Sequence, residues 1–213
     1  MTVYYHAKFF CQKACIPDET LLEAGIREDL LRQVGSETKI FLFCLSSILS
    51  RGMLTALSGA ETGIVVTTDL GAMEYYETFR ESILKNDAQP GAFKAAIPSF
   101  TASAAALQFG LKGPTITMAD ERPFSLKSLH QGQRLIESGW CDHVVAGGFS
   151  SVSRTGELLR GGATLTKGYW AVLLSRQRVL DGSPAVDSVA DSEVLGTVAD
   201  IRKLFPLFQP VGG

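Results

Sequence analysis

Short apolar runs alternate with helix-length patterns along this chain, and that alternation constrains the fold more than any other feature. The strand-like runs cover residues 3–10, 64–68, 115–118, 143–146, 169–174 and 194–199. The helical patterns cover residues 18–34, 39–57, 72–84, 99–109 and 125–138. Strands that alternate with helices predict a layered α/β domain. Residues 85–98, which are rich in Asn, Asp, Gln, Pro and Gly, are expected to form a surface loop.

The amino-acid composition and net charge limit the kinds of binding partner that this protein is expected to have. The 213 residues are 46% hydrophobic, which suits one globular domain over residues 1–213. A net charge of −2 argues against a nucleic acid or an anionic membrane as the main partner. The most apolar segment, residues 40–49, is too short to span a bilayer, and no secretory pattern opens the chain. We therefore expect a cytoplasmic protein.

The cysteines do not indicate a disulfide framework or a metal centre. Four are present, which is few for a disulfide scaffold of this length. Cys44 and Cys141 stand in or beside apolar runs and are expected to be buried. Cys11 and Cys15 have no second Cys or His pair at zinc-ligand spacing. We expect no metal and no cofactor.

One stretch of the sequence contains a motif that indicates a chemical function. Residues 109–122 read Phe-Gly-Leu-Lys-Gly-Pro-Thr-Ile-Thr-Met-Ala-Asp-Glu-Arg. This stretch resembles the β-ketoacyl synthases, the condensing enzymes of fatty-acid and polyketide synthesis, whose run reads Phe-Gly-Leu-x-Gly-Pro, a short strand, then Thr-Ala-Cys. In that family the cysteine attacks an acyl thioester. Its position here falls on Arg122, whose guanidinium cannot act as a nucleophile.

Further motifs match the first half of a ketosynthase in their order. Residues 63–71 resemble its early strand and glycine turn, and residues 99–110 its alanine-rich helix. Residues 135–148 resemble Leu-Ile-x-x-Gly-x-x-Asp-x-x-x-Ala-Gly-Gly, and residues 167–174 resemble the later Gly-x-Gly-Ala-x-x-Leu-Val-Leu strand. The resemblance covers residues 60–199 well and the first 60 residues weakly.

The resemblance implies half of a thiolase fold: a layered βαβαβαβ unit with a mixed, mostly parallel central sheet between helices. In ketosynthases a second half supplies two histidines, and we expect this chain to correspond to the N-terminal half alone, with an apolar tail over residues 200–213. His6, His130 and His143 do not fall where those histidines would act. We expect them to be ordinary surface or core residues.

No catalytic residue is identified. Ser125 is expected to cap the helix that follows, and the helix N-terminus beside Arg122 offers an anion or thioester contact. The alternative is that Arg122 pairs with Asp120, Glu121 or another chain at the surface. Ser125 and Ser128 have no recognisable base partner, so neither replaces the cysteine.

The resemblance also implies a partner. In ketosynthases the strand before the nucleophile lies on the dimer two-fold axis, and here that strand consists of Thr115, Ile116, Thr117 and Met118. A half-fold would also leave an apolar face uncovered. We expect a homodimer, or a heterodimer with a full-length ketosynthase, and an acyl carrier protein as a further possible partner.

Two functions from different classes remain open. The first is a non-catalytic partner subunit in fatty-acid-like or polyketide-like acyl chain synthesis, similar to truncated ketosynthase-like proteins and to chain-length-factor subunits. The second is an enzyme, a divergent acyl or malonyl thioester transferase or decarboxylase that uses Arg122 to hold a carboxylate or polarise a carbonyl. A stand-alone domain with an unrelated binding role is a third reading.

Overall fold

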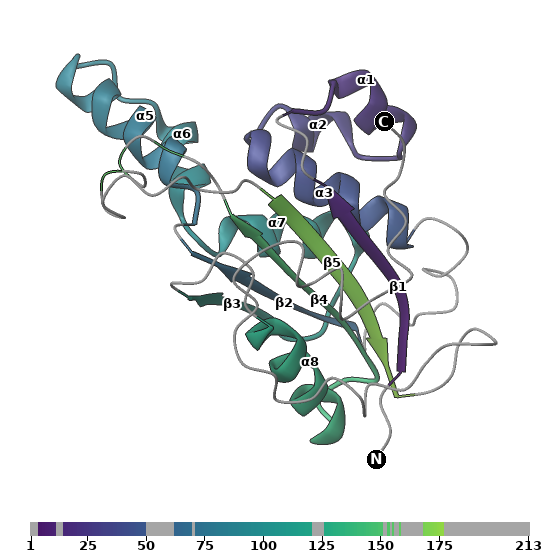
Figure 1. The fold of residues 1–213 in the computed structure, drawn as a ribbon. Coiled ribbons are helices and arrows are strands. Elements are labelled where there is room, and N and C mark those ends of the chain that lie inside the picture. The colour runs from purple at the N-terminus through teal and green to yellow at the C-terminus, as the bar shows by residue number, and fades with distance from the viewer. Residues whose placement is uncertain are drawn as a thin grey trace.

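The computed structural model describes residues 4–11, 15–49, 62–69, 71–120, 126–150, 153, 155, 158 and 168–176; for residues 4–11 it describes the backbone alone. The strands are β1 (Tyr4–Cys11), β2 (Thr62–Thr68), β3 (Thr115–Ala119), β4 (His143–Ser150) and β5 (Gly168–Ser175). The helices are α1 (Asp18–Glu23), α2 (Glu28–Leu31), α3 (Ser36–Leu49), α5 (Met73–Leu84), α6 (Pro90–Ala96), α7 (Phe100–Phe109) and α8 (Lys127–Glu137). Figure 1 shows them around a central sheet.

The described strands form one mixed sheet in the order β1-β5-β4-β2-β3. β2 pairs in parallel with both β3 and β4, whereas β5 is antiparallel to β4 and to β1. Four strands therefore run one way and β5 runs the other. The predicted mixed, mostly parallel sheet is confirmed.

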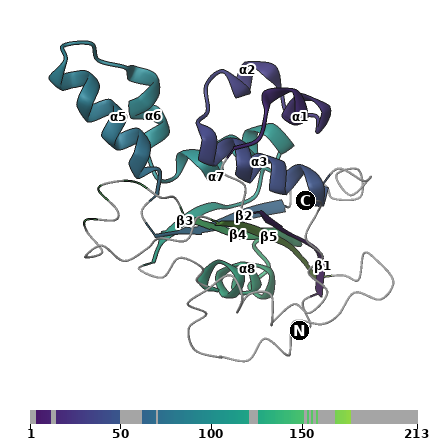
Figure 2. The same ribbon diagram turned by 45° about the horizontal axis from the view of Figure 1, so that its top comes forward.

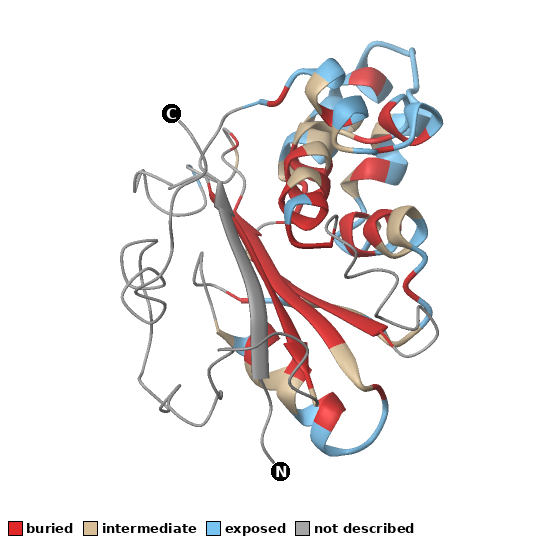
Figure 3. Ribbon diagram, turned by 90° about the vertical axis from the view of Figure 1, so that its right-hand side faces the viewer, coloured by how far each residue is buried: buried red, intermediate tan, exposed pale blue. Residues whose placement is uncertain are grey.

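Helices cover both faces of the sheet, with α3 and α7 on one side and α8 on the other (Figure 2). Neighbouring strand positions serve opposite faces, because side chains alternate along a strand. Val66 and Tyr169 belong to the apolar cluster with α3 and α7, whereas Val65 and Trp170 belong to the cluster with α8. Because both faces are covered, β2 and β5 are buried throughout and β4 is buried from Val144 onward (Figure 3), which explains their apolar sequences.

The helix predicted over residues 18–34 is instead two short helices. Gly25 follows α1 with φ of +81°, a left-handed conformation that glycine adopts without steric cost and that ends a helix. Its backbone N–H donates to the carbonyl oxygen of Leu22. Leu21, Ile26 and Leu30 remain buried on either side of the break, so the apolar spacing marked the buried face correctly but not the interruption.

The loop predicted over residues 85–98 contains a helix, α6. Pro90 stands in its first turn, where a missing N–H costs no hydrogen bond. α6 folds back on α5, and the rings of Phe79 and Phe93 lie 5.0 Å apart. The proline that suggested a loop is therefore a helix start.

Gly147 and Gly148 lie inside β4 and do not end it, contrary to the sequence-based expectation. A Cβ on Gly148 would lie 2.5 Å from Nε1 of Trp170, and one on Gly147 would lie 2.7 Å from the Trp170 carbonyl oxygen. The two glycines make room for the tryptophan of the neighbouring strand. The predicted strand at 194–199 and the tail at 200–213 fall outside the described residues.

Candidate functional site at the carboxyl edge of the sheet

The chain reverses its direction of winding between β2 and β3. These strands are parallel neighbours, yet the connection after β2 leads to α7 and the one after β3 leads to α8, on the opposite face (Figure 2). Ligands of open α/β sheets bind outside the carboxyl ends of strands at such a switch point. The carboxyl ends of β2, β3 and β4 are therefore where a functional site is expected.

Polar groups link the three strands at this edge. Ser150, the last residue of β4, donates its hydroxyl to Oδ2 of Asp69 at 2.8 Å, directly after β2. The backbone N–H of Asp120, directly after β3, donates to the Thr68 carbonyl oxygen at 3.0 Å. The Thr68 hydroxyl in turn accepts from the backbone N–H of Gly71 at 3.0 Å. The edge is held together by contacts between residues far apart in sequence.

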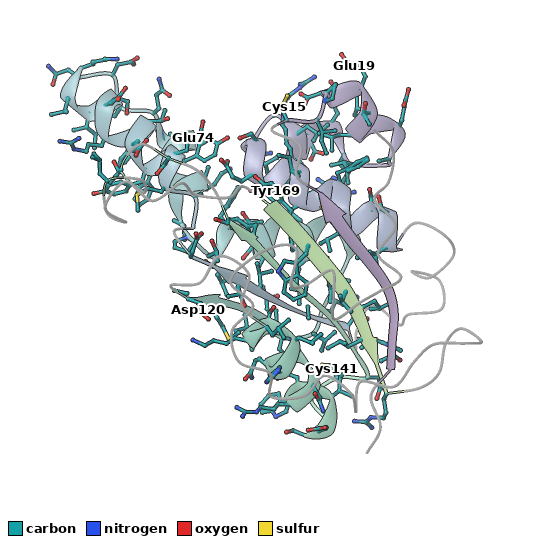
Figure 4. All side chains as sticks on the ribbon, viewed as in Figure 1. Cys15, Glu19, Glu74, Asp120, Cys141 and Tyr169 are labelled. Atoms are coloured by element: carbon teal, nitrogen blue, oxygen red, sulfur yellow. The ribbon has the colours of Figure 1, made fainter. Side chains whose placement is uncertain are left out.

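An ion pair joins the end of β3 to the start of α8. Nζ of Lys127, in the first turn of α8, lies 3.1 Å from Oδ2 of Asp120. The Asp120 side chain is only 5% exposed, whereas that of Lys127 is 57% exposed. A carboxylate near a helix N-terminus is also favoured by the helix dipole. Figure 4 shows Asp120 beside the first turn of α8.

In the sequence, the predicted site residues lie between the two members of this ion pair. Arg122 and Ser125 belong to residues 121–125, which lie outside the described part of the chain. α8 begins at Lys127, and Leu126 holds its N-cap position, one residue after the predicted cap. Ser128 is completely buried. Both contacts proposed for Arg122 stay predictions.

Strand β3 stands at the end of the described sheet, as expected for Thr115, Ile116, Thr117 and Met118. It pairs with β2 on one side, and within the described residues no strand pairs with its other side. Thr115 is exposed and the next three residues are half-buried. Its role as a dimer edge that pairs with another chain stays a prediction.

His143 and Cys141 lie at the other end of the sheet. His143 opens β4, at the end of the sheet opposite to Asp120, and burial lowers its pKa. Cys141 precedes it, and burial raises the pKa of its thiol, as expected for an inert core cysteine. Cys44 is also buried, as predicted. Among the described residues, no group of three or more His, Cys, Asp or Glu side chains could hold a metal ion.

The contacts of Asp69 with Ser150 and of Asp120 with Lys127 were not predicted from the sequence. A signal was present, because Asp69 comes directly after the predicted strand 64–68 and Asp120 comes two residues after the predicted strand 115–118. None of the helices that the structure describes is long and apolar enough to cross a membrane.

A mixed, mostly parallel sheet of this order between layers of helices is consistent with half of a thiolase-like α/β fold. The family model for the β-ketoacyl synthase N-terminal domain matches residues 12–184. The chain belongs to this family. A comparison with curated protein sequences finds no match.

Solved structures share the fold. The ketosynthase ApeO in complex with its chain length factor ApeC, from Xenorhabdus doucetiae, matches with a TM-score of 0.63 and 13% identity over 84% of this chain and 81% of that one. A complex of a type II polyketide synthase acyl-carrier protein with its ketosynthase matches with a TM-score of 0.63 and 13% identity, over 83% and 63%. An oxazolomycin ketosynthase domain of Streptomyces albus matches with a TM-score of 0.57 and 22% identity, over 77% and 32%.

The solved structures differ in how much of their own chain this protein covers. The chain covers 32% of the oxazolomycin ketosynthase chain and 37% of an ishigamide ketosynthase/chain length factor chain. At these identities the likeness establishes the fold alone, so activity and partners are matters for proposal.

Proposed function

We propose that this protein is a non-catalytic partner subunit in ketosynthase-type acyl chain synthesis, which binds a full-length ketosynthase or an acyl carrier protein. The observation that carries the proposal is Arg122, because it occupies the family's nucleophile position. Nucleophilic catalysis at that position needs a thiol or hydroxyl. A guanidinium there can bind, but it cannot form an acyl-enzyme bond.

The described surroundings support a structural role for this edge. Asp120 is engaged by Lys127, and Asp69 accepts the Ser150 hydroxyl. The buried Cys141 lies at the opposite end of the sheet from these contacts. The first contact joins the end of β3 to α8 and the second joins the end of β2 to β4, which suits a scaffold that presents surfaces to a partner.

The edge of β3 supports the choice of partner. An exposed sheet edge pairs readily with another chain, and the structural relatives include a ketosynthase with its chain length factor and a ketosynthase with its acyl-carrier protein. By analogy, β3 of this protein would pair with the corresponding strand of a ketosynthase.

Co-purification tests the proposal. The tagged protein is co-expressed with a full-length ketosynthase and, separately, with an acyl carrier protein from the same genome, and stable capture of either is expected. Thr115→Lys places a charge on the exposed edge and should weaken ketosynthase capture at least tenfold. Ser103→Lys, at an exposed position on α7, is the matched control and should leave capture unchanged.

Two results would contradict the proposal. The first is failure to capture any ketosynthase or carrier protein. The second is turnover of acyl or malonyl thioesters that Arg122→Ala abolishes, since this would identify an Arg122-dependent enzyme instead.

A further inference from the structure

Three polar side-chain atoms on the α8 side of the sheet are buried and have no hydrogen-bond partner in the part of the chain that the structure describes. They are Oγ1 of Thr67 in β2, Oγ of Ser128 in the first turn of α8, and Nε1 of Trp170 in β5. Thr67 is 2% exposed, and Ser128 and Trp170 are completely buried. Buried polar groups in native proteins are hydrogen-bonded to protein or to ordered water, so these three require a partner.

Thr67 and Trp170 lie on either side of one glycine in the sheet. Thr67 is paired with Gly148 in β4, and Gly148 is paired with Trp170 in β5. Val65, Ala146 and Trp170 belong to the apolar cluster with α8. Because side chains alternate along a strand, Thr67 points to the same face as Trp170, and Gly148 has no side chain between them.

The indole nitrogen of Trp170 lies over this glycine. A Cβ on Gly148 would lie 2.5 Å from Nε1 of Trp170 and 3.1 Å from the Thr67 carbonyl oxygen. Nε1 therefore stands above β4, about one strand spacing, roughly 5 Å, from the Thr67 side chain. That separation is too long for a direct hydrogen bond, but one oxygen atom that makes two bonds of about 2.8 Å spans it.

The first turn of α8 covers the same space from the helix layer. A Cβ on Gly132 would lie 2.9 Å from Cγ1 of Val144, which fixes where the helix crosses β4. Ser128 lies one helical turn, about 5.4 Å, nearer the carboxyl edge of the sheet. Along β4 this distance covers about two residues, to Ala146. The buried Ser128 hydroxyl therefore lies over β4, between the rows of Ala146 and Gly148.

The burial of these groups favours a small occupant. Side chains that are at most 2% exposed are separated from bulk solvent, which excludes a large ligand. The polar groups nearer the edge are already engaged, Asp69 by Ser150 and Asp120 by Lys127. An indole N–H only donates, whereas a serine or threonine hydroxyl can donate or accept. One water molecule can accept from the indole and bond to both hydroxyls, and three bonds are typical of buried water.

We propose that Trp170, Thr67 and Ser128 bind one internal water molecule over Gly148. This water joins β2 and β5 to the first turn of α8, the helix that follows the predicted nucleophile position. The inference does not depend on the partner role proposed above, because it concerns contacts inside one chain.

Nuclear Overhauser effects between water and the indole N–H groups of the full chain, labelled with 15N in tryptophan, test this proposal. The chain has two tryptophans. Trp140 is 72% exposed and serves as the internal control, and Trp140→Phe assigns the two signals. Trp170 is expected to show contact with a long-lived water molecule, and Trp140 contact with rapidly exchanging water alone. A high-resolution crystal structure should show one solvent peak within hydrogen-bond distance of Nε1 and both hydroxyl oxygens.

Substitutions test the two hydroxyl partners. Thr67→Val and Ser128→Ala each remove one hydroxyl with little change in shape, and each should reduce the Overhauser effect at Trp170 by roughly half or more. Thr38→Val is the matched control, because it removes a similarly buried threonine hydroxyl from α3, on the opposite face of the sheet. It should leave the effect at Trp170 unchanged. Circular dichroism checks that each variant is folded, and the two wild-type measurements decide the proposal if a variant does not fold.

Three results would overturn the proposal. The first is the absence of a long-lived water contact at Trp170 in the wild type. The second is an Overhauser effect at Trp170 that Thr67→Val or Ser128→Ala leaves unchanged, since this would refute a site with three partners. The third is crystallographic density over Gly148 that is larger than one water molecule, which would show that a different ligand occupies the site.

Discussion

Gly147 offers the most direct test of the central sheet. It lies in β4 between β2 and β5, opposite Val66 and Ala171. A methyl group at this position would lie 2.7 Å from the carbonyl oxygen of Trp170 and 3.1 and 3.2 Å from ring carbons of Phe41. The carbonyl is fixed in the β4–β5 ladder, and Phe41 is fully buried. Gly147→Ala therefore forces a shift in the sheet.

The magnitude follows from two opposing effects. Overpacking a well-filled core costs about 1–3 kcal/mol, and replacing glycine by alanine recovers about 0.4–1 kcal/mol by restricting the unfolded chain. The expected net loss of unfolding free energy is about 1–2 kcal/mol, which lowers the melting temperature by roughly 2–8 °C for a chain of this size.

The assay is thermal and urea unfolding of wild type, Gly147→Ala and a matched control, Gly91→Ala. Gly91 lies in α6, and no atom lies within 4 Å of an added Cβ. Alanine there should stabilise by up to about 1 kcal/mol through its higher helix propensity. If Gly147→Ala were as stable as Gly91→Ala, the glycine would have space around it, and the interpretation of Gly147 as an interior strand residue would be wrong.

Three further predictions concern single interactions. Lys127→Met removes the ion pair between Lys127 and the buried Asp120 carboxylate and should lower the free energy of unfolding in urea by about 1–2 kcal/mol. An unchanged urea midpoint would show that this ion pair does not stabilise the fold. Thr38 and Thr101 share a buried hydroxyl hydrogen bond of 2.9 Å, so Thr101→Val should cost about 1–2 kcal/mol, and adding Thr38→Val should recover part of it in a double-mutant cycle. Burial lowers the pKa of His143, so the folded state binds the proton less readily than the unfolded state, and the free energy of unfolding should fall as pH drops below about 6.5. His143→Gln should reduce this pH dependence, measured by urea unfolding at pH 7.5 and 5.5. An equally steep pH dependence in the variant would show that other groups cause it.

Local patterns in the sequence predicted most of the elements. β2, β3 and β5 fall within two residues of the expected runs, and α7 begins one residue after the expected start. The wrong predictions occur where one local sequence signal is compatible with two different structures. Pro90 was interpreted as part of a loop but starts α6, and Gly147-Gly148 was interpreted as a strand end but lies within a strand. In both cases packing against another element decided the outcome.

The candidate site was likewise only partly predictable from the sequence. Counting from Gly113-Pro114 predicts Arg122 at the nucleophile position, because a motif is a local property of the chain. The bond between Asp69 and Ser150 joins residues 81 apart in sequence, and no local pattern encodes such a pair. Asp120 and Lys127 are close in sequence, but their ion pair forms only because β3 and α8 meet at the carboxyl edge.

By itself, the sequence determined the α/β class and the relation to the ketosynthases, because periodicity and motif spacing are properties of neighbouring residues. Only the tertiary structure decided three things: that β3 ends the described sheet, that the polar residues after β2, β3 and β4 meet, and that Thr67, Ser128 and Trp170 are buried on the same face of the sheet. The physical reason is that strand order and side-chain exposure depend on contacts between segments distant in the chain, whose formation local propensity does not specify.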